Sequence, residues 1–227
     1  MTLLALWLAA APSASQAAQF EALAAKYVQD LFERHPESAT RAGEHRNDAR
    51  LDDYSREGVE KDLAANRAYL QQLEAIQIAQ LPQEDSVDAR ILRNRLEQQI
   101  YALSVLREWE WNPMRYNPGS ALYELVAREF APPEQRLRSA IGRLNAVPTV
   151  LAAGRANLKN PPKVHTETAI NQLKGTIGLI STGQLEQLAK SVPALEAEYR
   201  PAQQKALKAL QEQVEWLQKE LLPKANG

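Results

Sequence analysis

The stretch from Asp85 to Tyr116 constrains the fold most, because its apolar residues recur with the period of an α-helix. Five of them follow one another at steps of three or four: Leu92, Leu96, Ile100, Leu103 and Leu106. That spacing puts all five on one helix face. We expect Asp85 or Ser86 to cap the start, and Asn112 to end the helix because it precedes Pro113. The pattern predicts one helix of roughly 25 residues, about 38 Å long, as the central pillar of a bundle.

The same period recurs along the rest of the chain, and no stretch alternates between apolar and polar residues as a strand would. Further helices are expected at Gln19 to Arg34, Ser38 to Ala42, Arg56 to Ile76, Ser120 to Phe130, Pro133 to Ala146, Thr166 to Lys190 and Glu196 to Leu222. Pro148 either kinks the chain or starts a new helix, and Gly183 is a possible break. The prediction is an all-α fold, an irregular multi-helix bundle with two long helices and no sheet.

The segment from Gly43 to Ser55 is polar, rich in acids and without helical periodicity, so it is expected to be a loop. Gly43 suits a left-handed helix C-cap, and Asp53 or Ser55 suits the N-cap of the next helix.

Composition and charge exclude several classes of function. The formal net charge is -1 and the charges are of mixed sign, so neither a nucleic acid nor a membrane surface is indicated as a partner. The chain contains no cysteine, which excludes disulfides, thiolate zinc sites, a cysteine nucleophile and the lipid-carrying cysteine of a bacterial lipoprotein.

Residues 1–17 have the features of a secretory signal peptide. An apolar run from Leu3 to Ala11 is followed by Ser15-Gln16-Ala17, a small-x-small pattern that predicts cleavage before Ala18. No lysine or arginine precedes the run, so an ordinary buried first helix is the alternative. We therefore expect residues 18–227 to form a single helical domain of a periplasmic or secreted bacterial protein. The run is too short to span a membrane.

The three histidines do not form a recognisable catalytic motif. A zinc peptidase requires two histidines one helical turn apart with a glutamate beside the first, and none of His35, His45 and His165 has that context. His165 and Glu167 match the spacing of zinc deaminases, but the thiolates that those enzymes need are absent.

Two other groups of residues are candidates for binding. The polar group Gly43, His45, Asp48, Asp52 and Asp53 either lines a substrate pocket, binds a cation or is a solvated loop. The aromatic group Trp109, Trp111, Tyr116 and Tyr123 either forms a ligand cleft or packs in the core. Spacing alone leaves these alternatives open.

Several motifs together are similar to the bacterial domain-of-unknown-function 885 family. The run from Phe32 to Ser55 resembles the opening signature of that family, with its proline, Ala39-Thr40, Gly43-x-His45-x-x-Asp48, Leu51, Asp53 and Ser55. Asn112-Pro113-x-x-Tyr116 and the end from Trp216 to Pro223 resemble it as well. The resemblance covers nearly all of the chain after residue 17.

Members of that family are longer and resemble helical zinc metallopeptidases. Their metal motif, an HExxPGH-like helix, lies beyond the region matched here. The resemblance implies the N-terminal, cleft-forming helical region of an exported zinc-metallopeptidase-like hydrolase that is inactive alone. No catalytic residue or metal ligand is then expected in this chain, and zinc is expected only in the missing C-terminal half. The candidates for a substrate channel are His45, Asp48, Asn112 and Tyr116.

The partners implied are that C-terminal half and a peptide substrate, with self-association through the last helix as a further possibility. A self-standing periplasmic binding or scaffold module is the alternative function. Neither function involves a nucleic acid, or a membrane once the signal peptide is removed.

Overall fold

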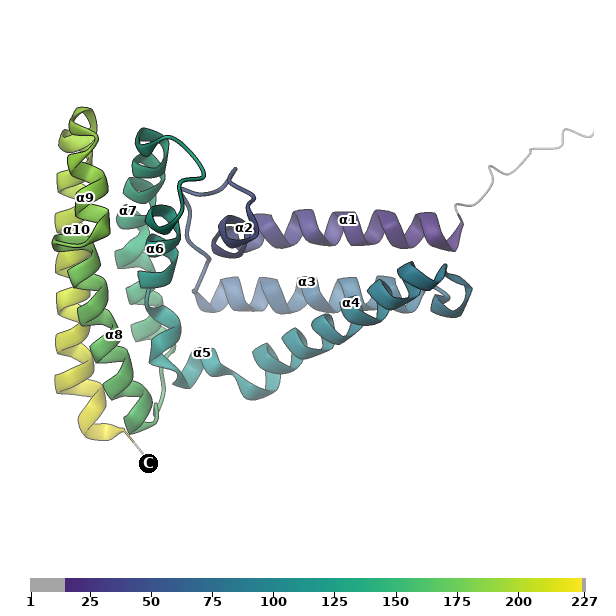
Figure 1. The fold of residues 1–227 in the computed structure, drawn as a ribbon. Helices are drawn as coiled ribbons and strands as arrows, with labels where there is room; N and C mark the ends of the chain where they lie inside the picture. The colour runs from purple at the N-terminus through teal and green to yellow at the C-terminus, as the bar shows by residue number, and fades with distance from the viewer. Residues whose placement is uncertain (1–14, 226–227) are drawn as a thin grey trace, which may run out of the picture.

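Two groups of helices make up the fold, and Figure 1 shows them set at a steep angle to each other. The computed structural model describes residues 15–225, and no β-sheet is present in that range. The upright bundle contains α6 (Gly119–Ala127), α7 (Pro133–Asn157), α8 (Lys163–Ser181), α9 (Gln184–Lys190) and α10 (Glu196–Trp216). The arm contains α1 (Gln16–Arg34), α3 (Arg56–Glu74) and α4 (Gln83–Tyr101). The short helices α2 (Pro36–Ala42) and α5 (Glu108–Trp111) lie between the two groups. The prediction of an all-α fold is confirmed.

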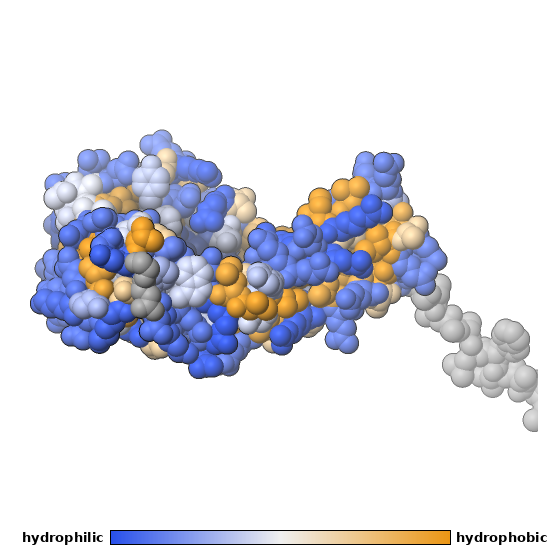
Figure 2. Space-filling model, turned by 90° about the horizontal axis from the view of Figure 1, so that it is seen from below, coloured by the Kyte–Doolittle hydropathy of each residue, from blue (hydrophilic) through white to orange (hydrophobic). Residues whose placement is uncertain are grey.

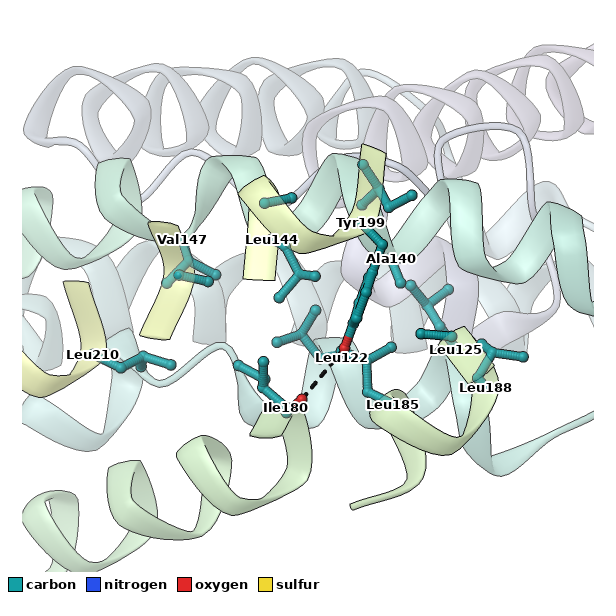
Figure 3. Packing of buried hydrophobic residues seen from close by; sticks show 14 of the residues in the cluster. Leu122, Leu125, Ala140, Leu144, Val147, Ile180, Leu185, Leu188, Tyr199 and Leu210 are labelled. Carbon is teal, nitrogen blue, oxygen red and sulfur yellow. Dashed lines mark hydrogen bonds between the residues drawn. The ribbon is translucent and has the colours of Figure 1, made fainter. Parts of the chain in front are cut away.

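The bundle has its own hydrophobic core, centred on the paired helices α7 and α10. Figure 3 shows how side chains from α6, α7, α8, α9 and α10 interdigitate there. Leu122, Leu125 and Leu144 are fully buried, and each contributes about 1.5–3 kcal/mol by leaving water. The hydroxyl of Tyr199 donates to the carbonyl of Ile180 at 3.3 Å, so this buried polar group is satisfied.

Of the two helix breaks considered from the sequence, at Pro148 and at Gly183, only the second is found. Helix α7 continues through Pro148, so the proline neither ends it nor starts a new helix. The break at Gly183 is confirmed, because α8 ends at Ser181 and α9 begins at Gln184. The Gly183 N–H donates to the carbonyl of Gly178 at 2.9 Å, which satisfies one of the open carbonyls at that helix end.

The arm has a second, separate core between α1, α3 and α4. Its buried side chains are Phe20, Leu23, Tyr27, Tyr69, Leu73, Ile76, Leu81, Ala89, Leu92 and Leu96. The rings of Tyr27 and Tyr69 meet edge to face, with their centroids 5.2 Å apart. The predicted cap of α3 is confirmed, since the Ser55 Oγ accepts from the Gly58 N–H at 3.0 Å. Gly43 has φ of 90° and forms the predicted left-handed C-cap of α2.

The predicted long helix is found in part, because helical backbone runs from Gln83 to Leu106 and breaks at Arg107, before the expected end at Asn112; its predicted place at the centre of the bundle is wrong. Helix α4 starts at Gln83 after Pro82, not at a cap on Asp85 or Ser86, and it ends at Tyr101. A π-helical turn, Ala102–Leu106, follows, and Arg107 then breaks the helix with φ of 50°. The centre of the fold is therefore the α7–α10 pair, while α4 lies in the arm (Figure 1).

The two tryptophans after the break explain why it is tolerated. The indole N–H of Trp109 donates to the carbonyl of Leu103 at 3.1 Å, and that of Trp111 donates to the carbonyl of Leu106 at 2.8 Å. Both carbonyls belong to the π-helical turn, where the regular helical hydrogen bonds stop. Trp109 is buried beside Val59 and Leu103, as the packing alternative for the aromatic group requires.

Most of the predicted signal peptide, residues 1–17, lies outside the described residues. The part inside them begins α1, where the Ser15 Oγ accepts from the Ala18 N–H at 3.2 Å. Cleavage before Ala18 therefore stays a prediction. Within residues 15–225, no helix is both long and apolar enough to cross a membrane.

Candidate functional site

A cavity of about 240 Å³ opens where the arm meets the loop between α2 and α3. Its lining combines charged and apolar side chains from α1, the loop, α3, the π-helical turn and the 3-10 turn Pro113–Tyr116: Glu33, Arg34, His35, Arg50, Leu51, Asp52, Asp53, Tyr54, Gly58, Val59, Lys61, Asp62, Leu103 and Arg115. A second cavity of about 170 Å³ shares His35, Asp62 and Arg115 with it. Convergent polar groups beside an apolar wall are typical of a ligand site.

His35 ties three elements together at the edge of the cavity. It ends α1, its Nδ1 lies 3.0 Å from the Asp52 Oδ2 in the loop, and its Nε2 lies 3.1 Å from the Asp62 Oδ1 on α3. Arg34 forms an ion pair with the same Asp62 carboxylate.

A reciprocal pair of hydrogen bonds fixes the loop against α2. The Glu37 N–H donates to the Asp52 Oδ1 at 3.2 Å, and the Asp52 N–H donates to the Glu37 Oε1 at 3.1 Å. The Tyr54 hydroxyl also donates to both oxygens of Glu37. Burial, followed by repulsion from Asp52, raises the pKa of Glu37. Burial, with Glu37 next to it, likewise raises the pKa of Tyr54 well above its usual value.

Arg143 on α7 holds the bundle to this loop, and its side chain is fully buried. Its Nε donates to the carbonyl of Arg50 at 3.0 Å, and its Nη2 donates to the Thr40 Oγ1 at 2.5 Å. Its Nη1 donates to the carbonyl of Ala121 on α6. Burial lowers the pKa of Arg143, and the nearby carboxylates of Glu37, Asp48 and Asp52 oppose that shift. One buried cation thus connects α7 and α6 to α2 and the loop.

The structure separates the four residues proposed from the sequence into two pairs. His45 Nδ1 lies 2.9 Å from the Asp48 Oδ2, and the Thr40 hydroxyl donates to the other oxygen of Asp48 at 2.6 Å. The ring of His45 stacks on Phe130 with a centroid distance of 3.9 Å. This pair lies beside Thr40, which also accepts from Arg143, and outside the lining of the two cavities.

Asn112 and Tyr116 hold the 3-10 turn that carries Arg115. The Asn112 Oδ1 accepts from the Met114 N–H at 3.1 Å, which caps the turn. The hydroxyl of buried Tyr116 donates to the carbonyl of Trp109 and accepts from the Asn157 Nδ2 at 3.2 Å. Both side chains are occupied in these bonds, and neither lines the cavity, whereas Arg115 on the same turn does. A contact of any of the four residues with a substrate stays a prediction.

His35 and Asp62 were not anticipated as site residues, although the sequence carries a signal for one of them. The inward face of α3 contains Val59, Asp62, Asn66, Tyr69 and Leu73 at helical spacing. Two polar residues within such an apolar stripe indicate a buried polar contact. The partner of Asp62 is far away in the sequence, so periodicity alone does not name it.

The residues of the junction do not fit a metal ion. Within residues 15–225, no group of three or more histidine, aspartate and glutamate side chains converges on a common point where a metal could be held. Asp52 and Asp62 lie on opposite sides of the His35 ring and bind its two different nitrogens. The arrangement favours hydrogen bonding and ion pairing with a ligand over metal coordination.

Comparison with known proteins identifies relatives of this architecture. No curated protein matches the sequence. Among solved structures, the chain is similar to one described as "a putative lipoprotein of unknown function from Shewanella oneidensis", with 28% identity and a TM-score of 0.81. The match covers 91% of this chain and 37% of the Shewanella chain, so the protein spans well under half of that relative's length. The family described as "Bacterial protein of unknown function (DUF885)" matches residues 36–227. The chain therefore belongs to the DUF885 family.

Proposed function

We propose that this chain is the cleft-forming helical region of an exported, zinc-metallopeptidase-like hydrolase and does not catalyse hydrolysis alone. The observation that carries the proposal is the match to 37% of a longer protein, in which this whole fold recurs as one part. Binding sites are often found between such parts of a larger protein. The cavity at the junction of arm and bundle would then form one side of the cleft.

The surface of the arm supports a further polypeptide as the partner. Large apolar side chains stay exposed along α4 and its π-helical turn: Val87, Ile91, Tyr101, Val105 and Leu106. Figure 2 views the molecule from the side of α5 and shows hydrophobic surface beside the bundle and farther along the arm. Contiguous exposed apolar surface is typical of a contact with another protein surface. The remaining part of the longer relatives is the proposed occupant, and it would also supply the zinc ligands.

A self-standing helical binding module is the second candidate, and the two closed cores favour it, because each group of helices buries its apolar face without a partner. The apolar side chains on α4 distinguish the two functions. Strong binding of a dye that reports exposed apolar surface would favour the cleft-forming region, and weak binding would favour the module.

The hydrolase proposal predicts that the purified chain does not cleave a mixture of short peptides, with or without added zinc. The physical reason is the lack of a converging set of metal ligands among residues 15–225. Product analysis by mass spectrometry checks this, with the longer Shewanella protein as the positive control. Zinc-dependent cleavage by this chain that a chelator abolishes would contradict the inactive part of the proposal. Failure of the control to cleave any peptide would contradict the hydrolase part.

We also propose that the protein is periplasmic or secreted. The similarity to a protein described as a lipoprotein supports export, and residues 1–17 would direct it. Fusing residues 1–25 to a reporter that is active only in the periplasm is expected to yield activity. Replacing Leu4 and Leu8 with arginine in the same fusion breaks the apolar run and is expected to abolish it. Equal activity of the two fusions would contradict an export signal.

A further inference from the structure

The guanidinium of Arg115 has no hydrogen bond or ion pair with any residue of the described part of the chain, although Arg115 lines both cavities at the junction. It sits on the 3-10 turn Pro113–Tyr116, whose two ends are fixed by the Asn112 cap and the buried Tyr116 hydroxyl. The turn therefore presents a guanidinium from a rigid support, as binding sites require.

The other basic side chains of the cavity already lie against carboxylates. Arg34 forms an ion pair with Asp62, and its guanidinium nitrogens are buried. His35 lies between Asp52 and Asp62. The two remaining cations pair at the rim: Arg50 with Glu33 at 3.3 Å, and Lys61 with Glu57 at 2.7 Å. Arg115 is thus the cation of this cavity that remains available for an anionic ligand within the described residues.

The acidic residues in the cavity lining limit which anions can bind beside Arg115. Glu33, Asp52, Asp53 and Asp62 also line the cavity, so a multiply charged anion such as a phosphate ester would be repelled. A carboxylate carries a single charge and matches the planar fork of a guanidinium with two parallel hydrogen bonds.

The apolar lining residues and the volume of the cavity limit the chemistry and the size of the group that carries the carboxylate. Leu51, Val59 and Leu103 lie in the lining and would accept an aliphatic side chain. A volume of about 240 Å³ is near or below the low end for ligand pockets, which suits one amino-acid residue better than a long chain.

The geometry points to a site for a carboxylate attached to an aliphatic group, with Arg115 binding the carboxylate. The carboxylate is that of a free small acid or of a peptide C-terminus, which share this chemistry. The peptide alternative deepens the proposed hydrolase function and rests on it, whereas carboxylate binding itself does not.

Calorimetric titration of the purified chain tests this with four probes: acetyl-leucine, acetyl-leucinamide, acetyl-Ala-Ala-Leu and its C-terminal amide. Both acids are expected to bind at least tenfold more tightly than their amides, because only the acids form the charge-assisted pair with Arg115. Tighter binding of the peptide acid than of acetyl-leucine assigns the site to a peptide C-terminus. Equal or weaker binding of the peptide acid assigns it to a free small acid.

Arg115→Gln is expected to weaken binding of the acids by about tenfold or more and to leave the amides unchanged. Arg115 is exposed, so the variant should keep the urea midpoint of the parent chain. Arg90→Gln is the matched control, since Arg90 is an exposed arginine of α4 that lines neither junction cavity. Its affinity should equal that of the parent chain.

The inference is overturned if neither acid binds, if acids and amides bind equally, or if Arg115→Gln binds the acids as well as Arg90→Gln does. None of these results depends on catalysis. If the acids do not bind but the longer relative cleaves peptides, this site is rejected and the proposed function is retained. If the acids bind as expected but the longer relative cleaves no peptide, the carboxylate site is supported and the hydrolase function is rejected.

Discussion

Replacing Arg143 with methionine is expected to lower the free energy of unfolding by about 3–5 kcal/mol. Arg143 is fully buried and donates to Thr40 and to the carbonyls of Arg50 and Ala121. Methionine fills similar space but offers no donor, so the buried acceptors Thr40 and the Ala121 carbonyl lose their partner. The carboxylates of the junction also lose the cation that opposes their repulsion.

Urea denaturation of the two proteins, followed by circular dichroism, measures this difference. Arg90→Met is the matched control, because it makes the same chemical change at an exposed position of α4 and should leave stability nearly unchanged. A loss below about 1 kcal/mol in Arg143→Met would mean that the buried arginine does not hold bundle and loop together.

The second large effect is expected at Gly142, one residue earlier on α7. A Cβ added there would lie 2.6 Å from the carbonyl oxygen and 2.8 Å from the Cβ of Ala49 in the loop. Backbone must therefore shift, and Gly142→Ala is expected to destabilise the protein by about 1–3 kcal/mol despite the better helix propensity of alanine.

Gly175→Ala on α8 is expected to change stability in the opposite direction, because nothing lies within 4 Å of the added Cβ. The gain in helix propensity then remains, and stability should rise by up to about 1 kcal/mol. Thermal and urea unfolding of the two variants side by side check the signs. A stabilised Gly142→Ala variant would show that loop and helix do not approach as closely as described.

The helices could be predicted because each rests on local information. The spacing of apolar residues that identifies α3 or α10 is also the spacing that buries them, and the Ser55 and Gly43 caps need only neighbouring backbone. The helix break at Arg107 could not be predicted in this way. It depends on two indole groups that reach back to carbonyls five and six residues earlier, and the apolar residues at helical spacing continue up to Leu106, directly before it.

The site was predicted only in part, for the same physical reason. The loop between Gly43 and Ser55 was identified as polar, and His45 and Asp48 do contact each other within it. The contacts that build the cavity join distant residues: His35 meets Asp62 across 27 positions, and Arg143 meets Thr40 across 103. The residues that neighbour His35 or Arg143 in the sequence do not indicate which distant residue its side chain contacts.

The bond between Arg143 and Thr40 has a consequence for how the protein is made. Its two residues are 103 positions apart, so a nascent chain that has emerged only as far as α6 contains the whole arm but not the side chain that fixes its loop. Synthesis proceeds from the N-terminus and takes seconds over such a distance. All residues that line the cavity have then been made, since the last of them is Arg115, but Arg143 can bind the loop only after α7 has left the ribosome.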